Sequence, residues 1–218
     1  MSLYQELKYL RKGYHPEVWM DYYFYRRISI FFNMFFIPLR IPPIIVNILV
    51  VLADFFVIYL MFKSYWMLAG IFVHLAAILD CCDGEVARYN IYKKGKKYGS
   101  FGAYLDSVVG TVGFTLMVFF AGYFLGNIWI GLFAMFGLFM VILSAGYAAA
   151  FFQQKDKIAK KVREKLFGKR KIVIGFTDGV QRWFVSIAIF FASLPILFLF
   201  GLAANAFWVF KFWVYRNH

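Results

Sequence analysis

Cysteine and histidine are scarce in this sequence. Its 218 residues include two cysteines and three histidines. The cysteines, Cys81 and Cys82, are adjacent, so neither a disulfide framework nor a C-x-x-C metal motif is indicated. The histidines at positions 15, 74 and 218 form no recognisable cluster. Any metal site would therefore have to be built from oxygen ligands.

Acidic residues are also few, and a soluble domain is missing. The chain has 11 Asp and Glu against 24 Lys and Arg, a formal net charge of +13.

Hydrophobic residues make up 63% of the chain, against roughly 45–50% in soluble domains. Apolar runs recur along the whole length, so one cleavable signal before a soluble body does not fit, and we expect no targeting peptide to be removed. No internal repeat is present. The composition predicts an integral membrane protein.

Six windows are long and apolar enough to predict membrane-spanning helices, which need about 20 such residues. They are approximately 44–62, 65–82, 103–124, 128–152, 180–198 and 199–215. Only the tripeptide "SLP" around Pro195 separates the last two, which leaves open a tight helical hairpin or one long, broken helix. The predicted fold is therefore an all-α integral membrane protein with six transmembrane helices.

The basic residues predict the orientation of these helices. They concentrate in the first forty residues, between the second and third windows, and in "KDKIAKKVREKLFGKRK" between the fourth and fifth. The positive-inside rule then places both termini and the three basic regions in the cytoplasm of a multi-pass cell-membrane protein. Because topology already explains this charge, nucleic-acid binding is not indicated. For the run 155–171, anionic lipid headgroups are a better partner than a substrate phosphate.

The chain divides at residue 43. Residues 1–43 contain "HPEVWMDYYFYRRISIFFNMFFIPLRIPP", where Trp, Tyr and Arg mix with apolar residues. This composition predicts an amphipathic helix lying on the cytoplasmic face of the membrane. An anchor without a catalytic part is the favoured interpretation. Residues 44–218 would form the six-helix transmembrane catalytic domain.

A cluster of carboxylates lies at the end of the second window. Asp80 and Asp83 are three residues apart, so on a helix they project from one face. Neighbouring carboxylates repel one another unless a cation such as Mg²⁺ or Mn²⁺ lies between them. In the third window, Gly102, Asp106 and Gly110 recur every four residues, which makes Asp106 a candidate third ligand. The glycine spacing alone favours helix packing.

These residues resemble the signature of a known protein family. "DCCDGEVAR" followed by "GAYLD" is similar to the signature of the CDP-alcohol phosphotransferases (CDP-alcohol phosphatidyltransferases), D-x2-D-G-x2-A-R, then G-x3-D-x3-D. The matching residues are Asp80, Asp83, Gly84, Ala87, Arg88, Gly102 and Asp106. "DGEVAR" and "FGAYLD" are most similar to the branch that includes di-myo-inositol phosphate phosphate synthases. There are two departures: the connection from Arg88 to Gly102 is longer than usual, and Gly110 replaces the last aspartate.

The resemblance implies an activity. Such enzymes use a divalent metal, here Mg²⁺ or Mn²⁺ on Asp80, Asp83 and Asp106, to transfer a substituted phosphate or phosphonate group from a CDP-linked donor to a lipid or polar alcohol, releasing CMP. It also implies that Arg88 holds a phosphate and that a homodimer forms among membrane lipids. The small residues Gly84, Ala87 and Gly102 would leave room for the cytidine. Outside the signature, Arg182 at the start of the fifth window could also reach an anionic substrate.

Gly110 leaves open whether the protein is an active transferase. In the family, the aspartate at this position helps to hold the metals and is the proposed base for the acceptor hydroxyl. Here Asp106 or Asp83 would accept the proton through water, or the metal would lower the pKa of the hydroxyl. A catalytically degenerate member that binds a CDP-linked donor or lipid is the second hypothesis.

The remaining acidic residues support other interpretations. Asp54 lies in the middle of the first window, where an ionisable residue suggests function, although Asn47 and His74 could satisfy it within the bundle. Such membrane-embedded acids make a small transporter a third hypothesis. Glu85 and Asp178 are expected to be solvated or paired.

Overall fold

In the part of the chain that the structure describes, the protein is mostly helical and has one short pair of strands. The computed structural model describes residues 3–12, 17–18, 20–95, 100–151, 172–173 and 178–216. The helices are α1 (Leu3–Lys12), the π-helix η1 (Asp21–Tyr25), α2 (Arg26–Phe36), α3 (Pro43–Phe62), α4 (Trp66–Lys94), α5 (Ser100–Phe124), α6 (Ile128–Phe151), α8 (Asp178–Phe190) and α9 (Leu194–Arg216). The strands β1 (Glu17–Val18) and β2 (Ile172–Val173) pair in parallel.

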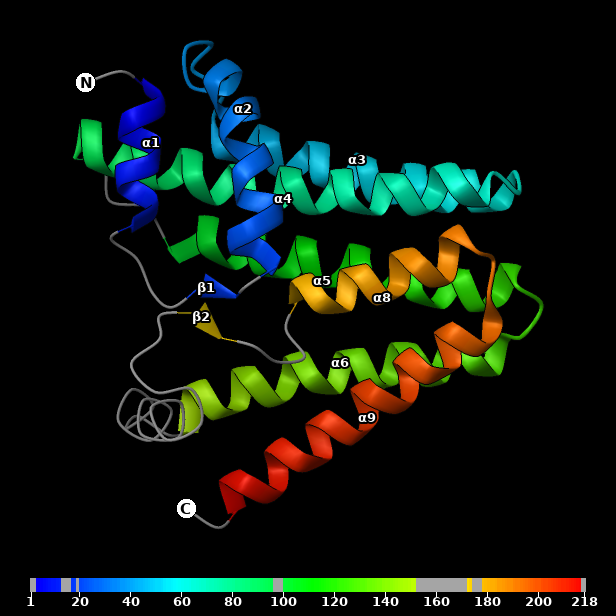
Figure 1. Ribbon diagram of the computed structural model, residues 1–218. Helices are drawn as coiled ribbons and strands as arrows, with labels where there is room; N and C mark the ends of the chain where they lie inside the picture. Colours follow the sequence, from blue (N-terminus) through cyan, green and yellow to red (C-terminus); the bar gives the residue numbers. More distant parts are fainter. Residues whose placement is uncertain are drawn as a thin grey trace.

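Figure 1 shows a bundle with two unlike ends. Helices α3, α4, α5, α6 and α8 run roughly along one direction, and α9 crosses beneath them obliquely. The turns at 63–65, 125–127 and 191–193 lie at one end, whereas the start of α1 and the end of α9 lie at the other. Helices α1 and α2 lie across that second end.

Among the described residues, three helices are long and apolar enough to cross a membrane by length and composition. They lie at Pro43–Phe62, Trp66–Lys93 and Leu194–Trp213, and shorter apolar stretches occupy Gly110–Phe124 and Ile128–Ser144. Large apolar side chains are exposed along α3, including Leu52 and Phe55. Such a face would be unfavourable in water and suits contact with lipid. The structure thus agrees with an all-α membrane protein.

The last two predicted spans form a hairpin, but its turn differs from the sequence prediction. Helix α8 ends at Phe190, and the chain turns through residues 191–193 before Pro195 rather than after it. Pro195 is the second residue of α9, where a missing backbone N–H costs no helical hydrogen bond. The 13 residues of α8 rise about 20 Å, which is less than the roughly 30 Å hydrocarbon core.

The main core joins all six long helices. Its largest buried side chains include Met61, Phe114, Leu138, Ile189 and Phe200. Helices α5 and α6 also approach closely where Gly122 lies against Gly131, because neither residue carries a side chain. This packing fixes how α4, α5 and α8, which carry the candidate site residues, lie relative to one another.

Helix α2 buries its polar side and exposes its apolar side. Ser29 and Asn33 are fully buried and donate hydrogen bonds of 2.9 and 2.6 Å to one carboxylate oxygen of Glu85 on α4. Phe31 and Phe35 are 61% and 70% exposed on the other side. The exposed face suits a membrane anchor, as the sequence predicts. The polar face adds a specific attachment to α4, so the expectation that Glu85 is solvated or paired is met by pairing.

We expect Glu85→Ala to loosen this attachment. The substitution leaves the amide of Asn33 buried without this acceptor, whereas the hydroxyl of Ser29 keeps the carbonyl of Arg26 at 3.2 Å, and the loss should cost about 2 kcal/mol of unfolding free energy. Glu85→Gln is the matched control, since its amide oxygen can accept the same bonds. Thermal unfolding in detergent should therefore show a lower midpoint for the alanine variant only. Equal losses in both variants would contradict the hydrogen-bond explanation.

Candidate active site

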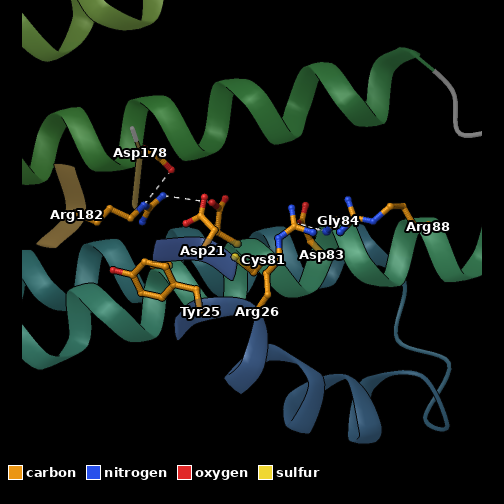
Figure 2. Close-up of a pocket in the computed structure, with 11 residues that line it drawn as sticks. Asp21, Tyr25, Arg26, Cys81, Asp83, Gly84, Arg88, Asp178 and Arg182 are labelled. Carbon is orange, nitrogen blue, oxygen red and sulfur yellow. Dashed lines mark hydrogen bonds and ion pairs between the residues drawn. The ribbon is translucent and has the colours of Figure 1, made fainter. Parts of the chain in front are cut away.

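A polar cavity of about 220 Å³ lies where η1, α4 and the start of α8 meet. Its lining contains four aspartates and three arginines. The lining residues are Asp21, Tyr25, Arg26, Ala77, Asp80, Cys81, Asp83, Gly84, Arg88, Asp178 and Arg182. Figure 2 shows Arg182 and Arg88 on opposite sides of the carboxylates of Asp21 and Asp83. Mixed charge of this kind suits a ligand that combines an anion with a cation.

Helix α4 carries the first half of the signature on one continuous helix. It runs to Lys94, twelve residues past the predicted end of the second span, and stops at Gly95, whose φ of 62° is the left-handed cap conformation. Asp80 and Asp83 therefore lie within the helix rather than at its end. Asp83 is 3% exposed and accepts a hydrogen bond from the backbone N–H of Gly84.

The remaining signature residues differ in what the structure describes. A Cβ added to Gly84 would lie 3.3 Å from Nη1 of Arg88, so the absent side chain leaves room for that guanidinium. Ala87 is not among the residues that line the cavity. Gly102 and Asp106 lie on α5, but their side-chain surroundings fall outside the described part of the chain.

Gly110 faces the cavity side of α4. A Cβ added there would lie 3.3 Å from Oδ1 of Asp80 and within 4 Å of no other described atom beyond its chain neighbours and its own helix backbone. Gly110 therefore does not serve a close backbone approach, unlike Gly122 in the same helix. Asp106 lies one helical turn earlier on the same face of α5.

Arg182 is held between two helices. It is 2% exposed, with its Nε 3.4 Å from Asp178 and its Nη2 3.5 Å from Asp80. The guanidinium lies 5.0 Å from the ring centroid of Phe114, a cation–π arrangement. Its Nη1 is buried with no hydrogen-bond partner among the described residues. An oxyanion in the cavity would satisfy that donor.

Six residues of the cavity were not predicted as site residues, and two of them, Ala77 and Cys81, lie on α4 beside the signature. Asp21, Tyr25 and Arg26 come from the N-terminal region, which the sequence suggested was an anchor, and Asp178 was expected to be solvated or paired. Asp178 does pair, with Arg182. The one available signal was an acidic residue, Asp21, within the aromatic and basic segment.

Asp21 is unfavourable as an anion in this setting. Burial raises its pKa to about 6, and the nearby Asp178 and Asp80 add to the rise. Arg26 and Arg182 oppose it. The cavity therefore resists a further negative charge unless a cation or a proton accompanies it.

Asp54 is not satisfied in the way the sequence suggested. Its two carboxylate oxygens are buried without a hydrogen-bond partner among the described residues, and one lies against Gly113. The ring nitrogens of His74 bond instead to Tyr25, at 2.9 Å, and to Ser186, at 2.8 Å. The interpretation in which His74 satisfies Asp54 is therefore wrong for this structure.

The donor set fits a divalent metal in part. Asp80 and Asp83 supply oxygens, the ligands that Mg²⁺ and Mn²⁺ prefer. Within the described residues no three His, Cys, Asp or Glu side chains converge closely enough to hold a metal. The predicted third ligand, Asp106, lies outside that search.

The fold and the cavity define a helical membrane protein with a carboxylate and arginine site suited to metal and phosphate. The profile of the CDP-alcohol phosphatidyltransferase family matches residues 39–214. The chain therefore belongs to this family, which is a family of enzymes, and the predicted resemblance is confirmed.

A curated relative supports the more specific resemblance. The "Bifunctional IPC transferase and DIPP synthase" of Archaeoglobus fulgidus is 29% identical over 146 residues. That alignment covers 66% of this chain but only 26% of the relative. Within the family, the chain is thus similar to the DIPP-synthase-like branch.

Proposed function

We propose that this protein transfers a substituted phosphate group from a CDP-linked donor to an alcohol acceptor and releases CMP. One observation carries the proposal: four signature residues, Asp80, Asp83, Gly84 and Arg88, line one cavity together with Arg182. The family match agrees with it. The product would be a phospholipid or a polar headgroup compound.

The site residues would have two roles, metal binding and phosphate binding. Asp80, Asp83 and Asp106 would hold a divalent metal, Mg²⁺ or Mn²⁺, which would neutralise the charge of the donor's pyrophosphate and polarise the phosphorus under attack. Arg88 and Arg182 bind the phosphate oxygens, since guanidinium groups bond bidentately to such anions.

The cytidine needs space beside these charges. Gly84 contributes it at the cavity, and Ala87 and Gly102 are assigned the same role by the signature alone. The described cavity of about 220 Å³ is smaller than a typical ligand pocket of roughly 300 Å³ or more. The donor would therefore extend beyond the described lining, toward α5.

The membrane arrangement is part of the proposal. We place six spans in a cell membrane, with both termini and the active site on the cytoplasmic side and the N-terminal region at the interface. Helices α3, α4 and α9 are the clearest spans. The described basic residues of α1, α2 and the end of α4 share the end of the bundle that carries the cavity, which supports the orientation that the positive-inside rule predicts. A homodimer would bury part of the exposed apolar helix faces.

Acceptor-dependent CMP release tests this function. Purified protein in nanodiscs would receive Mg²⁺ and a panel that pairs CDP-diacylglycerol or CDP-inositol with myo-inositol 1-phosphate or glycerol 3-phosphate, with a membrane lipid extract as a further acceptor source. Chromatography would measure the CMP formed. We expect release that requires both acceptor and metal, and no release from any pair would contradict a transferase.

A catalytically degenerate binding protein is the second candidate, because Gly110 removes a carboxylate beside Asp80. It predicts binding of CMP with Mg²⁺ but no turnover. Equilibrium binding of radiolabelled CMP by a preparation that releases no CMP from any donor and acceptor pair would identify this second function.

A further inference from the structure

The N-terminal region enters the cavity through a π-helical turn. Residues Asp21–Tyr25 form the π-helix η1 just before α2, and π-helical turns are frequent at functional sites. The hydroxyl of Tyr25 bonds to Nδ1 of His74 on α4, and Nε2 of His74 bonds to Ser186 on α8. Ser186 in turn donates to the carbonyl of Gly70 at 2.9 Å. This chain of bonds fixes η1 against the two helices that form the cavity.

Asp21 lies at the end of η1 nearest to α8. A Cβ added to Gly179 would lie 2.6 Å from Oδ1 of Asp21, so only glycine at position 179 lets the carboxylate approach so closely. In Figure 2 the Asp21 carboxylate points into the same space as the Arg182 guanidinium. The Nη1 of Arg182, buried and lacking a described partner, is an independent sign that a ligand enters there.

Position 110 provides no carboxylate beside Asp80. Gly110 brings no side chain toward Asp80 from α5. Asp21 reaches the same cavity from the N-terminal region. The cavity thus has a carboxylate, outside the signature, that can face an acceptor hydroxyl next to a phosphate bound by Arg182.

We propose that Asp21 binds the hydroxyl of the acceptor alcohol and takes up its proton, in place of the carboxylate absent at position 110. The inference rests on the proposed function. The acceptor oxygen forms a bond to the outer phosphorus of the CDP-linked donor while the bond from that phosphorus to the bridging oxygen breaks. CMP leaves with the electron pair, and the proton passes to the carboxylate of Asp21 and then to water.

The test compares wild type with Asp21→Asn, Gly110→Asp and the double variant. The substrate pair is the one in the panel above that gives the highest wild-type rate. Asparagine keeps the size and capping ability of aspartate but cannot accept the proton. We expect Asp21→Asn to lower CMP release by roughly 10²-fold or more, the usual contribution of a general base, while CMP affinity with Mg²⁺ changes less than twofold. Adding Gly110→Asp should restore at least tenfold.

Two further variants separate chemistry from structure. Gly179→Ala keeps the carboxylate but displaces it, so it should lower the rate in the same way. Glu6→Gln is the matched control, since it removes a carboxylate of the N-terminal region that pairs with Lys93 outside the cavity. It should leave the rate unchanged.

The outcomes are distinct. Wild-type turnover that survives Asp21→Asn overturns this inference and leaves the transferase intact. A variant that loses CMP affinity as well as rate, or that Gly110→Asp does not rescue, makes Asp21 a structural residue and also overturns it. A wild-type protein that releases no CMP with any pair overturns the proposed function, and this inference with it.

Discussion

Asp83→Ala should lower CMP release by on the order of 10³-fold, the largest effect of any single change considered. A metal bound to the phosphates contributes several kcal/mol of transition-state stabilisation, and about 1.4 kcal/mol corresponds to each factor of ten in rate. Asp83 is 3% exposed and lines the cavity from the interior of α4.

The measurement is the initial rate of CMP release across a Mg²⁺ titration, with Mn²⁺ binding followed by electron paramagnetic resonance. We expect weaker Mn²⁺ binding in Asp83→Ala, and a thermal unfolding midpoint close to that of wild type. Glu6→Gln again serves as the control, because its carboxylate pairs with Lys93 away from the cavity. A rate within tenfold of wild type would show that Asp83 is not a metal ligand.

Arg182→Met should weaken the binding of CMP by roughly 10- to 100-fold. A hydrogen bond to a charged group is worth about 1.5–3 kcal/mol, and removing this arginine takes away such a bond to the phosphate. Its buried Nη1 is the donor that no described residue satisfies. The CMP affinity of Arg182→Lys should fall between those of wild type and Arg182→Met. An ammonium group cannot contact Asp178, Asp80 and a phosphate with fixed planar geometry.

A loss of CMP affinity in Arg182→Met can be interpreted only if the variant remains folded. The side chains of Asp80 and Asp178 are 28% and 61% exposed, so the two ion-pair partners of Arg182 keep contact with solvent when it is lost. Methionine also keeps packing against Phe114. We therefore expect folded protein by size-exclusion chromatography with reduced CMP affinity. Unchanged affinity in a folded variant would mean that Arg182 serves only to pair the two aspartates.

The signature predicted the α4 half of the site well, because its spacing is local. Asp80, Asp83, Gly84 and Arg88 are close in sequence, and any helix brings them to neighbouring positions. The cavity contains all four, although their chemical roles remain predictions. The apolar windows predicted α3 and α6 to within a few residues for the same reason, since hydrophobic length is a property of one segment.

Contacts between distant segments could not be predicted in this way. The tripeptide around Pro195 marked the break correctly, but the boundary between the predicted windows at 198–199 lay several residues too late, because proline is tolerated in the first turn of α9. Asp54 and His74 were plausible partners by composition. In the structure, His74 instead forms hydrogen bonds with Tyr25 and Ser186, because η1 and α8 pack against α4 from outside the first span.

By itself, the sequence determined that this is a helical membrane protein of a particular enzyme family, with carboxylates on α4 and a missing carboxylate at position 110. These properties follow from composition and from short-range spacing, which the chain carries whatever its tertiary packing. Only the tertiary structure decided that the N-terminal region contributes Asp21, Tyr25 and Arg26 to the cavity. That result depends on the polar face of α2 bonding to Glu85 and on the absence of a side chain at Gly179. Both are contacts between segments more than fifty residues apart, and no local pattern encodes them.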